Sequence, residues 1–448
     1  MTAAETRKGK VLIVSFLFPP DNSIGAVRVG KMAKYLPQFG WEPIVLAEEL
    51  EGAPKTLPLE MDETNVFRTT CPKIVSSLYR KLFGKGYGVA SQPSSGNLSL
   101  RSAAYRLLKL IPAFYYWPIC QTLVSNPICW HFHASKVAAQ ILSRHHIDVI
   151  FSSYSPSTSH FVASKLQQKT GVPWVAEFRD RWSLSTYATK PLRFLDKWAE
   201  RRLLKNSCLL ITVSQDWAAQ LQEMHSKKVA VIPNGFDEED YLEHVPLLSK
   251  FTITYTGGIL YAGKRDPTPL FEALKQLLEE GRLSPDNFEL RFFGGSSLSI
   301  LFSLIKDYHL EGIVKIYNMV PFKESIKRQK ESTILLLLSW NDPRDKGTYT
   351  GKVYEYLGAQ RPILAIAYKG GAIDRLLQES GTGILINEVG MIKRVLQHWL
   401  EEWHGSGRIV SYWEPDINIV KRYTRKEAAR KLADLLNEAS SLGIQKTH

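Results

Sequence analysis

Short apolar segments alternate with helix-length segments along the whole sequence, and this alternation starts twice. The first half contains "KVLIVSFLF", the helix-like "GAVRVGKMAKYLPQFG" and then "WEPIVLA". Strands in parallel sheets are apolar along their whole length because helices cover both faces of the sheet. The second half repeats the rhythm from "FTITYTGG" onward. The pattern therefore predicts an α/β protein with two doubly wound, Rossmann-like domains.

The length of 448 residues also indicates two domains, since single hydrophobic cores stop growing at about 250 to 300 residues. We predict an N-terminal domain at residues 1–240 and a C-terminal domain at residues 241–424, with the acidic connector "FDEEDYLEHVPLLSK" at their boundary. Leucines at helical spacing in residues 425–448 predict a final helix that packs back toward the N-terminal domain. We expect the strand ends of the two domains to face each other across a cleft, where ligands bind.

Several function classes are disfavoured by composition. The cysteines are scattered without metal-type spacing, which predicts reduced thiols in a cytoplasmic protein and no zinc site; they are Cys71, Cys120, Cys129 and Cys208. The apolar run "VLIVSFLF" near the N-terminus ends at a Pro pair, so we interpret it as a buried strand and not as a signal peptide. The stretch "LIPAFYYWPICQTLV" has 15 residues interrupted by proline, short of the about 20 that a spanning helix needs.

The net charge of +13 is concentrated in one segment. Residues 64–147 contain no Asp or Glu, but ten Lys or Arg and eleven aromatic residues. Such a mixture is typical of a surface that lies on anionic lipid, so we predict a basic, aromatic, membrane-facing insertion at about 64–147. Its membrane-facing residues are predicted to be Arg101, Arg106, Lys109, Tyr115, Tyr116 and Trp117. A solvated or buried insertion is one alternative, and nucleic acid, which we do not expect as a partner, is the other.

The segment "YTGGILYAGKRDP" follows an apolar strand and places Gly258, Gly263 and Lys264 at P-loop spacing. Arg265 replaces the Ser or Thr that would hold magnesium, which disfavours an NTPase. The turn at Gly257 and Gly258 still lets backbone amides approach an anion, and Lys264 and Arg265 offer positive charge to a phosphate. A plain structural turn is the alternative.

The segment "TYTGKVYEYLGAQRPILAI" predicts a helix that begins near Gly351 and leads into a buried strand. The amides and positive end of this helix suit a diphosphate, and Lys352 adds a full charge. Glu355, one turn further on, is an acceptor suited to vicinal hydroxyls such as those of a ribose. A solvated Lys–Glu pair is the alternative. The chain has no Asp-x-Asp motif, so we expect no metal on the diphosphate.

Together these pieces resemble the family 4 glycosyltransferases, which have the GT-B fold. The matching segments are the loop near Gly25, "VSQ" with "VIPNGFD", "YTGGILYAGKRDP" and "GKVYEYLGAQRPILA", in the family's order. The resemblance implies that the C-terminal domain binds a nucleotide-sugar co-substrate, with a UDP-sugar favoured and no cofactor. The implied donor-binding residues are Gly25, Gly257, Gly258, Lys264, Arg265, Met319, Val320, Thr348, Thr350, Gly351, Lys352 and Glu355. Within this set, Glu355 is implied to bind the ribose, and the backbone near Met319 and Val320 the base.

One position departs from the family pattern. Many members have a second glutamate eight residues before the one that corresponds to Glu355, and this sequence has Gly347 there. We expect Asp342, Asp345 or the amides of residues 347–350 to contact the donor sugar instead.

The segment "AEFRDRWS" lies at a strand end where relatives often have a histidine. Asp180 is predicted to accept a proton or hydrogen bond from the acceptor hydroxyl, with Arg179 orienting it. A simple ion pair between the two is the alternative. The full set of predicted catalytic residues is Asp180, Arg179, Lys352 and Arg265, whereas His160 is expected to be structural.

We therefore predict a metal-independent, hexosyltransferase-like glycosyltransferase, and the family resemblance implies that it retains anomeric configuration. Its acceptor is expected to be lipid-linked or a saccharide, in surface polysaccharide or glycolipid biosynthesis. Its predicted location is cytoplasmic, peripheral on the anionic inner face of the membrane. A sugar-nucleotide epimerase of the same fold and a non-catalytic nucleotide-sugar-binding protein are the alternatives.

Overall fold

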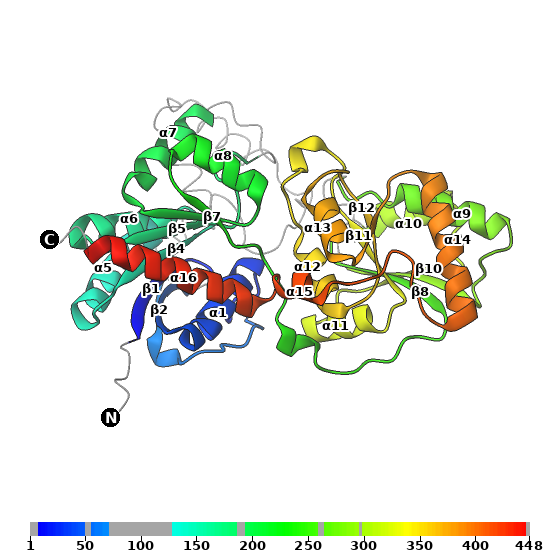
Figure 1. The fold of residues 1–448 in the computed structure, drawn as a ribbon, viewed down its shortest axis with the longest axis horizontal. Coiled ribbons are helices and arrows are strands. Elements are labelled where there is room, and N and C mark those ends of the chain that lie inside the picture. Colours follow the sequence, from blue (N-terminus) through cyan, green and yellow to red (C-terminus); the bar gives the residue numbers. More distant parts are fainter. Residues whose placement is uncertain are drawn as a thin grey trace, which may run out of the picture. The chain divides into compact units, whose positions relative to one another are not determined.

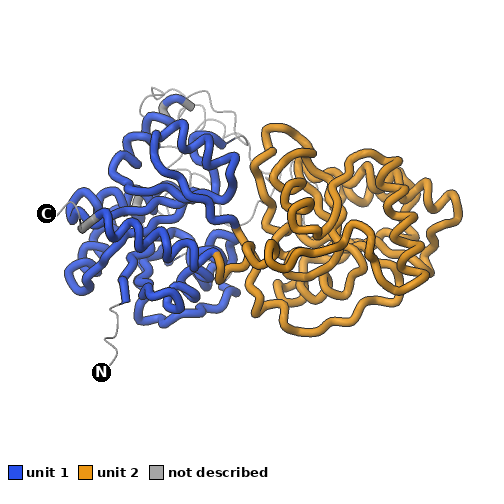
Figure 2. Tube along the Cα trace, viewed as in Figure 1, with its two compact units in different colours: residues 1–233, 428–448 blue, residues 234–427 orange. Residues whose placement is uncertain are grey.

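The structure is a computed structural model that describes residues 8–49, 55–70, 128–185, 193–258, 264–294 and 298–444. The chain divides into two compact units (Figure 2). Unit 1 comprises residues 1–233 and 428–448, and unit 2 comprises residues 234–427. Each unit contains one parallel sheet with flanking helices, so the predicted α/β class with two doubly wound sheets is confirmed.

Unit 1 is organised around a seven-stranded parallel sheet in the order β3-β2-β1-β4-β5-β6-β7 (Figure 1). Its strands are β1 (Gly9–Ser15), β2 (Trp41–Glu48), β3 (Val66–Thr69), β4 (Val149–Tyr154), β5 (Trp174–Phe178), β6 (Leu209–Thr212) and β7 (Val229–Val231). Its described helices are α1 (Ile24–Tyr35), α5 (Ile128–Arg144), α6 (Thr158–Thr170), α7 (Arg193–Leu203), α8 (Gln215–His225) and α16 (Arg425–Ile444), which starts at the end of unit 2. Short 3-10 helices occupy Leu36–Phe39, Glu63–Asn65 and Leu204–Asn206.

The central strand β1 explains why the sheet forms. Val11, Leu12, Ile13 and Val14 are all fully buried, although their side chains point alternately to opposite faces. The strand therefore needs helices on both sides, and α1 and α6 follow β1 and β4 to supply them. Ser23 caps α1 by accepting a hydrogen bond from the amide of Ala26, which fixes where this helix begins.

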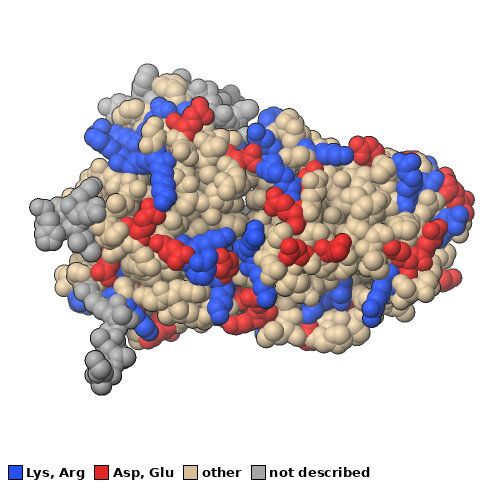
Figure 3. All heavy atoms as spheres, in the orientation of Figure 1, with Lys and Arg blue, Asp and Glu red and all other residues tan. Residues whose placement is uncertain are grey.

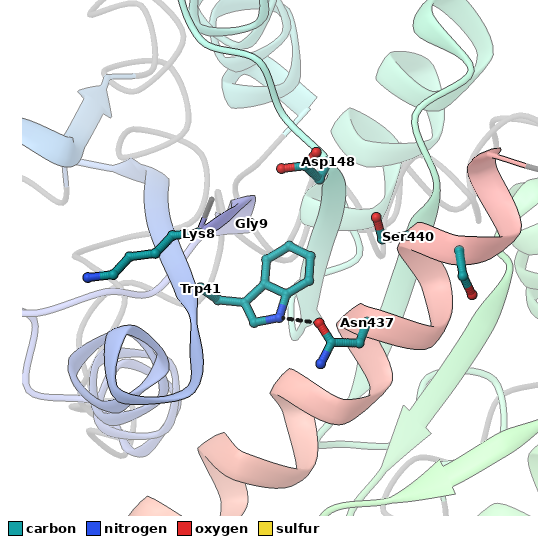
Figure 4. Close-up of a pocket in the computed structure, with 7 residues that line it drawn as sticks. Lys8, Gly9, Trp41, Asp148, Asn437 and Ser440 are labelled. Atoms are coloured by element: carbon teal, nitrogen blue, oxygen red, sulfur yellow. Dashed lines mark hydrogen bonds between the residues drawn. The ribbon is translucent and has the colours of Figure 1, made fainter. Parts of the chain in front are cut away.

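The last helix, α16, packs on unit 1, and Figure 1 shows it lying across this unit. Its buried side chains join a core cluster with those of β1, β4 and β6; they include Leu432, Leu436 and Ala439. Asn437 accepts a hydrogen bond from the Trp41 indole at 3.0 Å beside a hollow of about 360 Å³ (Figure 4). This hollow lies where β1 and β2 begin, at the opposite end of the strands from their carboxyl termini.

Unit 2 contains a six-stranded parallel sheet in the order β10-β9-β8-β11-β12-β13. Its strands are β8 (Phe251–Thr256), β9 (Phe288–Phe293), β10 (Val314–Tyr317), β11 (Ile334–Leu338), β12 (Ile363–Ile366) and β13 (Gly383–Leu385). Its described helices are α9 (Thr268–Glu279), α10 (Leu298–Asp307), α11 (Phe322–Lys330), α12 (Gly351–Ala359), α13 (Ala372–Ser380), α14 (Val389–Ser406) and α15 (Ile417–Lys421), with 3-10 helices at Glu238–Tyr241 and Pro343–Asp345. Strand β11, "ILLLL", is buried at every position, as expected for a central parallel strand.

The predicted basic insertion is only partly within the described residues. Its two ends contain β3 and α5, which belong to the unit 1 fold. The predicted membrane-facing residues lie outside the described residues; they are Arg101, Arg106, Lys109, Tyr115, Tyr116 and Trp117. Among the helices that the structure describes, none combines the length and the apolar character needed to cross a bilayer.

Candidate functional site

The candidate donor site of unit 2 lies at the point where the strand order reverses. Strands β8 and β11 are neighbours in the sheet, but the chain leaves β8 toward β9 and leaves β11 toward β12. Loops at the carboxyl ends of such a strand pair diverge and leave a crevice, which is where open α/β sheets bind ligands. The loop after β8 carries Gly257 and Gly258, and the loop after β11 leads to the start of α12.

The glycine turn after β8 is held next to Lys352. Gly257 has φ +135°, a conformation that residues with a side chain rarely adopt, and a Cβ there would lie 3.2 Å from Cε of Lys352. The carbonyl of Gly258 accepts hydrogen bonds from the Tyr255 hydroxyl at 2.6 Å and from Nη1 of Arg265 at 2.7 Å. The turn thus brings together four residues that the sequence predicted for the donor site: Gly257, Gly258, Arg265 and Lys352.

Helix α12 begins with two buried hydroxyls that have no partner. The Oγ1 atoms of Thr348 and Thr350 are buried without a hydrogen bond, and Thr350 does not cap the helix although it occupies the N-cap position. The first turn of α12 contains no acidic residue. Buried hydroxyls are usually hydrogen-bonded, because an unsatisfied one costs free energy. A helix amino end with positive partial charge and two unsatisfied hydroxyls is an arrangement suited to an oxygen-rich anion.

The carboxylate of Glu355 is held from two sides. Nζ of Lys352 lies 3.0 and 2.8 Å from its two oxygens, and Nε2 of Gln329 donates to Oε2 at 3.0 Å. Gln329, on α11, is fully buried and also donates to Oγ1 of Thr256 at 3.0 Å. Burial raises the pKa of the Tyr241 phenol well above its ordinary value, and the negative charge of Glu355 adds to that shift. Lys352 and Glu355 therefore pair with each other, as in the alternative considered for them, but the pair is only partly exposed and the buried amide of Gln329 also holds it.

Lys264 lies beside an aromatic ring in the loop after β11. Its ammonium lies 4.1 Å from the centroid of the Trp340 ring, and the guanidinium of Arg344 lies 4.5 Å from the same centroid. Arg344 also donates two hydrogen bonds to Asp342, at 2.8 and 2.7 Å, and these lower the pKa of Asp342 to about 2. Asp342, one of the residues considered for the donor sugar, is thus an ionised carboxylate paired with Arg344.

The predicted base-contacting residues follow β10. Met319 is 80% exposed in the loop between β10 and α11, and Val320 is half-buried beside it. Within the described part of the chain, no hydrogen bond or ring contact connects these two residues with the cluster around Lys352.

Unit 1 has a matching arrangement at its own reversal point, between β1 and β4. A Cβ on Gly25, in the first turn of α1, would lie 2.5 Å from the guanidinium carbon of Arg179. Arg179 follows β5 and donates to the carbonyl of Ser155, just after β4, at 2.8 Å. Glycine at position 25 therefore allows the guanidinium to lie directly against the helix start, and two predicted site residues meet there.

Arg179 also pairs with Asp180 at 3.3 Å, which is the simple ion pair considered as the alternative for these residues. The Asp180 side chain remains 56% exposed, whereas that of Arg179 is 14% exposed. The pairing therefore leaves most of the Asp180 carboxylate accessible to a ligand.

Two other polar residues of unit 1 are internal. Arg28 is fully buried, donates to Glu177 at 3.0 and 2.7 Å, and also bonds the carbonyls of Ile232 and Pro233. His160 is fully buried, with Nδ1 2.8 Å from the Ser152 hydroxyl. Burial lowers the pKa of His160 to about 3.

Sequence reasoning missed Gln329, Tyr255 and Trp340. Gln329 lies in the polar helix "FKESIKRQK", whose sequence does not distinguish a buried glutamine from a solvated one. Tyr255 lies at the carboxyl end of β8 and Trp340 lies just after the carboxyl end of β11, so these positions at strand ends were the available signal.

Comparison with solved structures identifies the fold. The Anabaena protein Alr3699/HepE in complex with UDP aligns with 15% identity and a TM-score of 0.60, over 96% of this chain and 100% of that one. Sucrose-phosphate synthase (tll1590) from Thermosynechococcus elongatus aligns with 13% identity and a TM-score of 0.53, over 98% of each chain. WaaG, described as a glycosyltransferase involved in lipopolysaccharide biosynthesis, aligns with 14% identity and a TM-score of 0.50, over 97% and 99%. The chain therefore has the GT-B fold of glycosyltransferases.

The sequence was also compared with protein families. Residues 25–240 match Glycosyltransferase Family 4, and this match confirms the resemblance predicted from the motifs. No curated protein matches the sequence.

Proposed function

We propose that this protein is a retaining glycosyltransferase that uses a UDP-sugar, without a divalent metal, to glycosylate a lipid-linked or saccharide acceptor. The proposed setting is surface polysaccharide or glycolipid biosynthesis at the cytoplasmic face of a membrane. The start of α12 carries the proposal, because it combines a helix amino end, two unsatisfied buried hydroxyls and a lysine in one place.

The donor half of the proposal rests on charge. Departure of a nucleoside diphosphate leaves negative charge on its phosphate oxygens, and fixed donors aimed at that charge lower the barrier. Lys352 and the amides of α12 are the proposed donors, while Glu355 accepts hydrogen bonds from the ribose hydroxyls. Lys352 already contacts Glu355 at 2.8 Å, so one ligand that touches both residues needs little rearrangement of either side chain. HepE, a structure with the same fold, was solved with UDP bound, which supports UDP as the first nucleotide to test.

Asp180 is the proposed acceptor-side group. It is the exposed carboxylate of its ion pair with Arg179, so it can accept a hydrogen bond from a sugar hydroxyl while Arg179 restrains its position. Arg179 is itself fixed by the Ser155 carbonyl and by its close contact with Gly25.

Isothermal titration with UDP and with UDP-sugars tests the donor site. We expect Lys352→Ala to weaken UDP binding at least tenfold, because it removes the full positive charge beside the α12 amino end. Lys393→Ala is the matched control, since Lys393 pairs with Glu280 outside the proposed site. Equal affinities of native protein and Lys352→Ala would reject the phosphate site.

Activity measurements test the remaining parts. Transfer from the best-binding UDP-sugar to lipid-linked acceptors is expected to continue in excess EDTA, because the proposed charge neutralisation uses protein cations. Loss of transfer in EDTA, restored by magnesium or manganese, would contradict metal independence. Conversion of the donor to an epimer without acceptor would favour the epimerase, and donor binding without either reaction would favour a binding protein.

A further inference from the structure

Helix α7 of unit 1 exposes two large aromatic side chains on one stripe. Phe194 and Trp198 lie four residues apart, which places them on the same helix face, and each is 61% exposed. The opposite side of the helix faces the interior, since the carboxylates of Asp196 and Glu200 are buried. The buried carboxylate of Glu200 has two partners: it accepts a hydrogen bond from the Ser183 amide at 2.9 Å and lies 3.1 Å from Nε2 of His225.

The aromatic stripe continues into a group of cations. Trp198 borders a hollow of about 420 Å³ whose lining also includes Arg201, Arg202, Lys205 and Lys227. No Asp or Glu occurs among the described residues that line it. Figure 3 shows Lys and Arg side chains gathered on the face of unit 1 where Figure 1 places α7.

The cations of this hollow are partly positioned by the fold. Nε of Arg201 donates to the Met224 carbonyl at 3.0 Å, and Lys227 donates to the Lys205 carbonyl at 2.8 Å. The Arg202 guanidinium lies 5.9 Å from the Trp198 ring centroid. The charges therefore stay close together beside the exposed indole, although like charges repel, so an anionic partner would relieve that repulsion.

We propose that the outer face of α7 from Phe194 to Arg202, together with Lys205 and Lys227, docks on a membrane that contains anionic phospholipid. Tryptophan and phenylalanine side chains on an exposed helix face insert at the headgroup boundary, and neighbouring lysines and arginines bind the headgroup phosphates. The residues of this site all follow the predicted insertion at 64–147 in the sequence. This proposal rests on the proposed function, and it assigns the proposed membrane binding to particular residues of unit 1.

Flotation with vesicles of 30% phosphatidylglycerol in phosphatidylcholine tests the proposal. Each lysine or arginine near an anionic surface strengthens binding by about fivefold. We therefore expect Arg202→Gln with Lys205→Gln to weaken vesicle binding by about 25-fold. Trp198→Ala should also weaken it, and pure phosphatidylcholine vesicles should bind poorly. The control removes the same charge from unit 2 with Lys306→Gln and Lys315→Gln, both exposed, and should bind as the native protein does.

Four results would overturn the proposal. They are unchanged binding of the Arg202/Lys205 variant, an equal loss in the Lys306/Lys315 control, tighter binding to a single-stranded oligonucleotide than to the anionic vesicles, and unchanged vesicle binding by Trp198→Ala. The Trp198→Ala variant removes an exposed side chain and no charge, so it tests the surface even if the charge variant misfolds. UDP binding by unit 2 is measured on every variant, so failure of the docking surface is distinguishable from failure of the proposed transferase function.

Discussion

Replacement of Gln329 by leucine should weaken both the stability of unit 2 and its affinity for UDP. The side-chain amide of Gln329 donates to Glu355 at 3.0 Å, to Thr256 at 3.0 Å and to Ser325 at 3.3 Å. Leucine has a similar volume and no donor, so the change isolates the hydrogen bonds from the packing. Glu355 would then be restrained by Lys352 alone, from one side.

The size of the effect follows from these contacts. A hydrogen bond to a charged group contributes about 1.5 to 3 kcal/mol and a neutral one about 1 kcal/mol. Oε1 of Gln329 is buried without a partner, so its removal offsets about 1 kcal/mol of the loss. We expect the free energy of unfolding to fall by about 2 kcal/mol. A poorly held Glu355 should weaken UDP binding about tenfold, equivalent to about 1.4 kcal/mol.

The assay combines thermal unfolding with isothermal titration of UDP. Gln276→Leu is the matched control, because Gln276 makes a similar amide-to-carboxylate bond with Glu272 at 2.9 Å on α9. A helix-surface pair of this kind contributes about 0.2 to 0.5 kcal/mol, so the control should change little. Glu355→Ala and the Gln329/Glu355 double variant complete a cycle, in which Gln329→Leu should add little once the carboxylate is absent.

Two results would refute this reasoning. Unchanged UDP affinity in a destabilised Gln329→Leu protein would mean that Glu355 needs no positioning by Gln329. Additive losses in the double variant would mean that Gln329 acts on UDP binding by a route other than Glu355.

Two predictions concern unit 1. Gly25→Ala should displace the Arg179 guanidinium, because the new methyl group would lie 2.5 Å from its carbon, and should lower kcat of sugar transfer at least tenfold. An unchanged kcat in this variant would contradict the prediction. Burial lowers the pKa of His160 to about 3, so below pH 6.5 the unfolded chain binds a proton that the folded chain does not. The free energy of unfolding should therefore fall with decreasing pH, by up to about 1.4 kcal/mol per pH unit between pH 6.5 and 3. His160→Phe should reduce this slope in thermal unfolding, whereas replacement of the exposed His404 should leave it unchanged; equal slopes in all three proteins would refute the assignment.

Much of the fold was readable from local patterns, because strands such as β1 and β11 are apolar at every position and glycines mark the turns that follow strands. The pairing of Lys352 with Glu355 was also accessible, since a spacing of three places both on one helix face. Gln329 was not accessible: it reaches Glu355 from another helix, 26 positions away in sequence. The contact between Gly25 and Arg179 likewise depends on the sheet order, which places β4 beside β1 and β5 beside β4.

In both candidate sites a cationic side chain packs directly against a glycine near the end of a strand. In unit 2 the missing side chain of Gly257 makes room for Lys352, and in unit 1 that of Gly25 makes room for Arg179. A cation held against backbone in this way is already oriented, so binding an anion or a carboxylate costs it little additional conformational entropy. This explains why the Lys352 and Arg179 side chains have fixed partners, Glu355 and the Ser155 carbonyl, instead of extending into solvent. Pre-oriented charge of this kind favours sugar transfer, because donors that are already in place stabilise the charge of a leaving diphosphate without a reorganisation cost during the reaction.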